Sequence, residues 1–102
     1  MLYYRRKILL ALLELFEGKL TAKSLQKYLF LFTRTQSVKC YDFVPYRYGC
    51  FSFQANQDIS TMSKYGYLKV SESTHGRFIE IKQTGNYLDM LDIFFFFFFF
   101  FI

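Results

Sequence analysis

Three segments of this chain repeat apolar side chains at the spacing of an α-helix, and each is bounded by residues that start or stop helices. The predicted helices cover residues 3–17, 22–35 and 53–65. The capping residues are Thr21 and Ser52 at the starts of the second and third helices, and Gly18 and Gly66 at the ends of the first and third. This succession predicts a small helical core.

Two further segments alternate apolar and polar residues, as β-strands do. Residues 67–71 and 77–82 flank a turn-forming Ser-Thr-His-Gly run, which predicts a β-hairpin. Between the second and third helices, residues 41–49 alternate aromatic side chains, and Pro45 forces the preceding residue to be extended. We expect a short strand or a packed loop there, and the start of a fourth helix over 86–92.

The order helix, helix, short extended segment, helix, hairpin, helix start is that of a winged helix, in which the hairpin is the wing. We therefore predict an α+β, winged-helix-like domain over residues 3–92, with three to four helices and a C-terminal two-stranded wing hairpin. A chain of 102 residues is long enough for one such domain and too short for two. Its 53% hydrophobic content excludes a disordered protein.

Residues 93–102 consist of Ile93, eight phenylalanines and Ile102. Ten apolar residues are about half of the roughly 20 that a transmembrane helix needs, and nothing polar flanks the run to hold it at a membrane interface. We interpret this segment as a low-complexity poly-Phe tail that is degenerate or marks a truncation. A membrane-dipping anchor is the alternative reading.

The N-terminus imitates a secretion signal, because the basic residues 5–7 precede an apolar run. Glu14 and Glu17 interrupt that run, and no small-residue cleavage site follows. We therefore expect a cytoplasmic protein in which Cys40 and Cys50 are reduced thiols. The apolar residues fall on one face of an amphipathic core helix: Ile8, Leu9, Leu12, Leu13 and Phe16.

Two stretches, residues 25–32 and 41–54, resemble the amino-terminal helical region of bacterial proteins that carry a domain of unknown function. A looser likeness is to the Panacea-type antitoxin domain, which has a similar Leu-Gln-Lys helix start and an aromatic-Gly turn. The resemblance covers roughly residues 3–70, and the Tyr-Asp-Phe-Val-Pro-Tyr run at 41–46 is its most distinctive part. It implies a winged-helix-like module of bacterial or phage origin, tied to toxin–antitoxin or phage-defence loci. It carries over no catalytic residue.

Double-stranded DNA is the partner that the charge pattern and the helix-turn-helix order predict. Residues 1–52 hold nine Lys and Arg against three Asp and Glu, whereas residues 53–92 hold four against five. The third helix would touch bases through its outer polar residues, and basic residues would hold the phosphates. The predicted contacts are Gln54, Gln57, Thr61 and Lys64 on the third helix, and Arg5, Arg6, Lys7, Lys23, Lys27 and Arg47 elsewhere. Against this prediction, Asp58 is expected to cancel Lys64 on the third helix.

Protein interaction is the alternative function, in which this module would be the front end of a larger toxin–antitoxin or phage-defence protein. Tyrosines could form the interaction surface, although each one singly is expected to lie in the core: Tyr3, Tyr4, Tyr46, Tyr48 and Tyr67. We expect no enzyme, because Cys40, Cys50 and His75 lack the arrangement of a nucleophile or a metal site. The expected state is two half-buried thiols and a surface histidine. We expect no metal, cofactor, small-molecule substrate or membrane partner.

Overall fold

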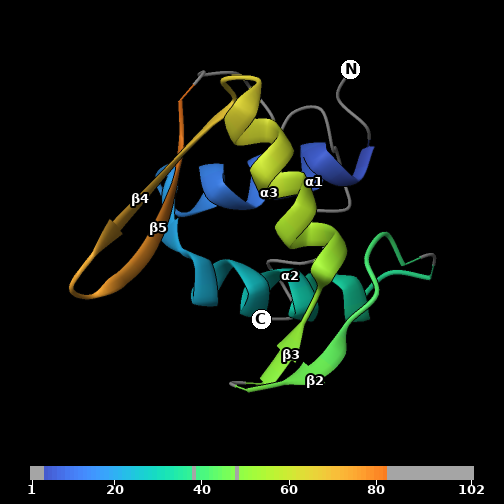
Figure 1. Cartoon of the computed structure of the whole chain (residues 1–102). Helices are drawn as coiled ribbons and strands as arrows, with labels where there is room; N and C mark the ends of the chain where they lie inside the picture. Colours follow the sequence, from blue (N-terminus) through green and yellow to red (C-terminus); the bar gives the residue numbers. More distant parts are fainter. Residues whose placement is uncertain (1–3, 38, 48, 83–102) are drawn as a thin grey trace.

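The structure is a computed structural model that describes residues 4–37, 39–47 and 49–82. This part of the chain contains three helices: α1 (Tyr4–Leu15), α2 (Ala22–Arg34) and α3 (Phe53–Lys64). The strands β1 (Lys19–Thr21), β4 (Leu68–Ser73) and β5 (Gly76–Ile81) form one antiparallel sheet in the order β1-β5-β4. The strands β2 (Val44–Tyr46) and β3 (Gly49–Phe51) form a separate hairpin (Figure 1). The predicted mixed α+β class is therefore confirmed.

Both predicted N-caps are confirmed. The Thr21 hydroxyl accepts a hydrogen bond from the Ser24 backbone N–H at 3.1 Å, and the Ser52 hydroxyl accepts one from the Ala55 N–H at 3.1 Å. Each bond satisfies one of the backbone donors that the first turn of a helix leaves without an intrahelical partner.

The first helix ends two residues earlier than predicted. Glu17 adopts a left-handed conformation with φ of 62°, followed by Gly18 with φ of 87°. The Gly18 N–H then donates to the Leu13 carbonyl at 2.7 Å, which closes the helix end. Glycine tolerates this backbone region without strain, but Glu17 enters it as well, so the helix stops at Leu15.

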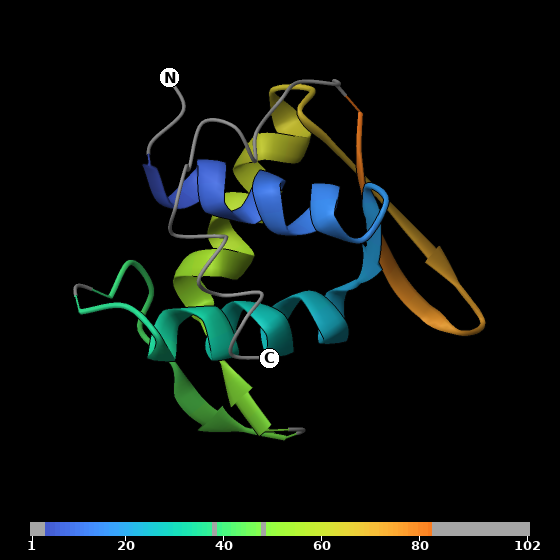
Figure 2. The same ribbon diagram turned by 180° about the vertical axis from the view of Figure 1, so that it is seen from behind.

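Helix α1 contributes the longest buried run of the core and contacts α2, β1 and β5. The run from Ile8 to Leu13 is fully buried, including Leu10 and Ala11, which a single amphipathic face would have left outside. The other core residues come from α2, the following loop, α3 and the sheet: Leu25, Leu29, Phe32, Tyr41, Ala55, Ile59, Met62, Leu68 and Ile79. Helix α3 lies nearest the viewer in Figure 1, and α1 and α2 are nearer in the reverse view of Figure 2.

The predicted hairpin over 67–82 is confirmed as β4 and β5, with the turn at residues 73–76. Strand β1 was not predicted, because three residues are too few for an alternating pattern to register. It pairs with β5 through Lys19↔Glu80, Leu20↔Ile79 and Thr21↔Phe78. The predicted extended segment over 41–49 includes β2, but it continues through β3 to Phe51 as a hairpin. The predicted helix over 86–92 and the poly-Phe tail lie outside the described residues.

Candidate nucleic-acid interface

Helix α3 has an inner and an outer face. Its buried residues are Ala55, Asp58, Ile59 and Met62, and its exposed residues are Phe53, Gln54, Asn56, Gln57, Ser60 and Lys64. The buried positions recur at helical spacing. Asp58 lies three residues after Ala55 and four before Met62, so helical geometry places its carboxylate on the core side.

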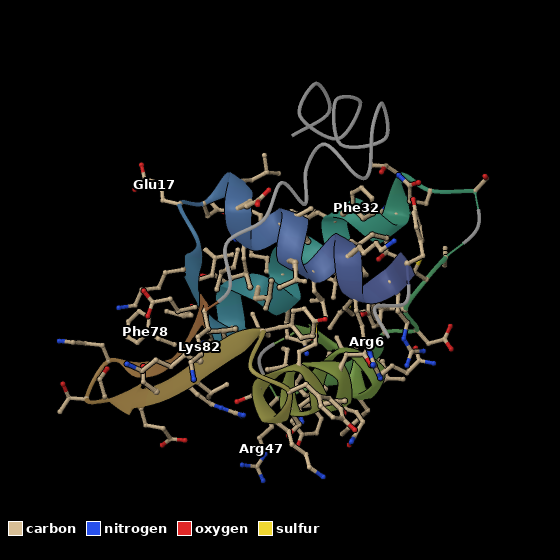
Figure 3. All side chains as sticks on the ribbon, turned by 90° about the horizontal axis from the view of Figure 1, so that it is seen from above. Arg6, Glu17, Phe32, Arg47, Phe78 and Lys82 are labelled. Carbon is tan, nitrogen blue, oxygen red and sulfur yellow. The ribbon has the colours of Figure 1, made fainter. Side chains whose placement is uncertain are left out.

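Asp58 has no exposed surface and is bound by two arginines of α1. Arg5 donates from Nε to Oδ2 at 2.8 Å and from Nη2 to Oδ1 at 3.2 Å. Arg6 donates from Nε to Oδ1 at 3.0 Å. The Arg6 side chain, labelled in Figure 3, reaches from α1 toward α3. These charge-assisted bonds compensate the burial of the carboxylate and join the start of α1 to the middle of α3.

Tyr41 completes this cluster from the loop between α2 and β2. Its hydroxyl donates its single proton to Asp58 Oδ2 at 2.7 Å and lies 3.0 Å from the backbone carbonyl oxygen of Arg5, a second acceptor for the same proton. The Arg5 guanidinium carbon lies 5.7 Å from the centre of the Tyr41 ring. Burial, together with the hydrogen bond to Asp58, raises the pKa of Tyr41 far above its ordinary value.

The expectation that Asp58 cancels Lys64 on the outer face of α3 is wrong. The Asp58 charge is turned into the core and neutralised by Arg5 and Arg6. Within α3, whose residues are all described, the outer face therefore carries no acidic side chain, and Lys64 is its single charged residue. The position of residue 58 among Ala55, Ile59 and Met62 is the sequence signal that could have revealed this.

The basic residues predicted to hold phosphates come from three separate elements. Arg5 and Arg6 keep 35% and 16% of their side chains exposed and are engaged with Asp58. Lys7 is half-buried on α1, and Lys23 and Lys27 are exposed on α2. Arg47 is exposed at the turn of the β2–β3 hairpin, and Figure 3 shows it pointing away from the body of the protein.

The predicted base-contacting residues on α3 differ in how far their side chains are exposed. Gln57 and Lys64 are exposed and Thr61 is half-buried. Gln54 is exposed too, but its side-chain oxygen accepts a hydrogen bond from the Asp42 N–H at 2.8 Å. This bond ties the loop before β2 to the first turn of α3, so Gln54 has a structural task besides any contact with a ligand.

An exposed apolar surface, of which the sequence analysis named Tyr46 alone, lies at the N-terminal end of α3. We call it the aromatic patch; it consists of Val44, Tyr46, Phe51 and Phe53. The three rings touch one another, with centroid distances of 5.1 Å for Tyr46–Phe51, 5.7 Å for Tyr46–Phe53 and 4.9 Å for Phe51–Phe53. Tyr46 is 51% and Phe53 is 58% exposed.

The expectation of a core position was wrong for Tyr4 and Tyr46, which are exposed, whereas Tyr67 is half-buried. Tyr3 and Tyr48 lie outside the described residues. Tyr46 lies on the two-stranded β2–β3 sheet, and its ring stays half-exposed although it contacts Phe51 and Phe53.

The reactive side chains are placed as follows. Cys40 is half-buried, and burial raises the pKa of its thiol. Cys50 is exposed on β3, contrary to the expectation of a half-buried thiol, and His75 is exposed in the β4–β5 turn as predicted.

Among the described residues, no group of His, Cys, Asp and Glu could hold a metal ion. No helix in that part of the chain is long and apolar enough to cross a membrane.

No family model matches this chain, and no curated protein or solved structure matches it significantly.

Proposed function

We propose that this protein is a small regulatory module that binds double-stranded DNA, with a winged-helix arrangement in which α3 enters the major groove. The connectivity supports this: β1 follows the first helix, pairs with β5, and leaves β4 at the other sheet edge. Helix α3 directly precedes the β4–β5 hairpin, which extends beyond the helices as a wing does (Figure 1). In such modules the second helix of the helix-turn-helix pair reads base edges.

The observation that carries the proposal is the removal of Asp58 from the surface of α3. A carboxylate on the outer face would repel phosphates, which supply much of the affinity of proteins for DNA. With that carboxylate bound to Arg5 and Arg6, the face offers amides, hydroxyls and one ammonium group. Asparagine and glutamine side chains can bind adenine through two hydrogen bonds, and lysine binds phosphate.

Arg5 and Arg6 are unsuitable for testing this proposal by substitution, although they stay predicted phosphate ligands together with Lys7. Arg5 and Arg6 already donate to Asp58, so replacing them would disturb the core as well as any DNA contact. Lys64 is the better probe, because it is exposed at the last turn of α3.

The test is a salt-series titration of the full chain with a 20-base-pair duplex. The affinity should fall steeply and linearly with salt on a logarithmic scale. Lys64→Gln should weaken binding several-fold at low salt and reduce the slope by about one. Lys19→Gln is the control, because it removes the same charge from β1. Strand β1 is at the opposite sheet edge from β4, and β4 is the strand that α3 contacts. This variant should leave the affinity and the salt slope unchanged. Absent or salt-independent binding would refute the proposal.

The one described cysteine whose pKa is shifted does not suit nucleophilic catalysis. Nucleophilic cysteines depend on a lowered pKa, whereas burial raises the pKa of Cys40.

The exposed rings of the aromatic patch support a second candidate function. In it, this protein is a protein-interaction module at the front of a larger toxin–antitoxin or phage-defence protein. It predicts no affinity for duplex DNA at moderate salt.

A further inference from the structure

The aromatic patch is continuous with the outer face of α3. Phe53 belongs to both surfaces, because it is the first residue of α3 and touches Tyr46 and Phe51. Gln57, Ser60 and Lys64 follow Phe53 by four, seven and eleven residues, which places all four side chains on one side of the helix. A ligand that lies along this face therefore meets the Phe53 ring at the N-terminal end.

The rings are held in place rather than left as independent side chains. Phe53 makes edge contacts with Tyr46 at 5.7 Å and with Phe51 at 4.9 Å. Val44, Tyr46 and Phe51 share one face of the β2–β3 hairpin, because Val44 pairs with Phe51 and side chains alternate along a strand. An exposed ring whose orientation is already fixed loses little entropy on binding.

The chemistry of the patch limits what it can recognise. It has no charged side chain, and its one polar group is the Tyr46 hydroxyl, so it is not a phosphate site. In the DNA major groove, the apolar group is the 5-methyl of thymine, and phenylalanine is among the side chains that contact it. The N-terminal residues of a recognition helix are those that contact base edges.

We infer that the aromatic patch reads thymine methyl groups in the major groove, with Phe53 as the residue in contact and Tyr46 as a positioning residue. This inference rests on the proposed function, since it requires α3 to enter the groove. It makes the protein prefer A·T sequences through apolar contact, in addition to any hydrogen bonds from Gln57.

The experiment compares two 20-base-pair duplexes, one of alternating dA and dT and one with deoxyuridine in place of every thymidine. The two have the same charge and the same hydrogen-bonding edges, and differ in the methyl group alone. The wild-type chain should bind the thymidine duplex about fourfold more tightly for each methyl contacted. Phe53→Ala should lose this preference and keep the salt slope. Tyr46→Ala should reduce the preference, because Phe53 loses one of its supports.

Tyr65→Ala is the matched control, because Tyr65 is also an exposed aromatic next to α3, but it lies at the opposite end of the helix and outside the patch. It should keep the full thymidine preference. Circular dichroism checks that each variant is folded; Phe53 is 58% exposed, so its replacement should leave the fold intact.

The outcomes separate the inference from the function on which it rests. If the wild-type chain binds neither duplex, the proposed function and the inference both fail. If it binds both duplexes equally, or if Phe53→Ala keeps the thymidine preference, the inference fails and DNA binding stands. Light scattering covers the remaining case: a dimer that Phe53→Ala dissociates, with no thymidine preference in the wild type, would make the patch a contact between protein copies and overturn the inference.

Discussion

Asp58 is a carboxylate without exposed surface, bound by two guanidinium groups and a phenol. Burying a charge is costly unless every lone pair has a donor, and here each oxygen has two. The cluster therefore fixes which way α3 faces, because rotating the helix would expose Ile59 and Met62 and leave the arginines without their acceptor.

Replacing Asp58 by Asn should lower the free energy of unfolding by about 3 kcal/mol, because it leaves two arginines facing a neutral amide. This value lies at the low end for buried pairs, since Arg5 keeps 35% of its side chain in water. Urea unfolding followed by circular dichroism measures the change. Glu80→Gln, at an exposed acid on β5, is the control and should change stability by less than about 0.5 kcal/mol. An equally stable Asp58→Asn variant would contradict a structural role for the ion pairs.

At the scale of elements, a buried glutamine on α2 fixes where α3 begins. Gln26 Nε2 donates to the Ser52 carbonyl at 3.1 Å, and the Ser52 N–H donates to Gln26 Oε1 at 2.9 Å. The Ser52 hydroxyl in turn caps α3. One side chain thus satisfies two buried backbone groups at the end of the β2–β3 hairpin and holds the N-cap in position.

Gln26→Leu should lower the free energy of unfolding by about 2–4 kcal/mol, because the Ser52 N–H and carbonyl would both be buried without a partner. Chemical denaturation measures this. Gln57→Leu makes the same change on the exposed face of α3 and should stay within about 0.5 kcal/mol of the wild type. If the two variants lost equal stability, the Gln26–Ser52 contact would not be what positions α3.

The elements that could be predicted are those whose signals are local. Capping residues and helical spacing marked α2 and α3, and a four-residue turn marked the β4–β5 hairpin. Strand β1 forms because it pairs with β5, about 60 residues further along the chain. A pairing between such distant segments produces no local pattern in the sequence. The helical spacing could have predicted that the Asp58 side chain faces the core. It could not have predicted the partners Arg5 and Arg6, since they lie more than 50 residues away in the sequence. Apart from Tyr46, the aromatic patch was not predicted for a similar reason. Ring-rich segments usually lie in the core, and whether a sheet covers them depends on tertiary structure.

Over the whole molecule, Tyr41 joins three parts of the chain, because its hydroxyl touches the backbone of α1 and the carboxylate of α3 from the loop after α2. Global unfolding releases all of these contacts together. The pKa of Tyr41 is raised by burial and by its bond to Asp58 from an ordinary value of 10.0. The native state therefore keeps a proton that the unfolded state gives up at high pH.

The sign of the pH dependence follows from this difference. Below about pH 10 both states hold the Tyr41 proton and its contribution to stability is complete; above it the unfolded state alone loses the proton, so stability should fall by up to about 1.4 kcal/mol per pH unit. Urea unfolding between pH 8 and 11 measures the slope. Tyr41→Phe should be less stable at pH 8 and show a shallower decline, with Tyr65→Phe as the control for loss of a hydroxyl. An unchanged slope in Tyr41→Phe would show that this proton is not linked to unfolding.

The pairing of β1 with β5 has a consequence for how the protein is made. A ribosome releases α1 and β1 first, but their partner strand is about 60 residues further along the chain. The six consecutive apolar residues of α1 therefore lack their contact with β5 until that strand has left the exit tunnel. The core of this domain therefore cannot be completed until β5 has been synthesised, and the nascent N-terminal half exposes apolar surface until then.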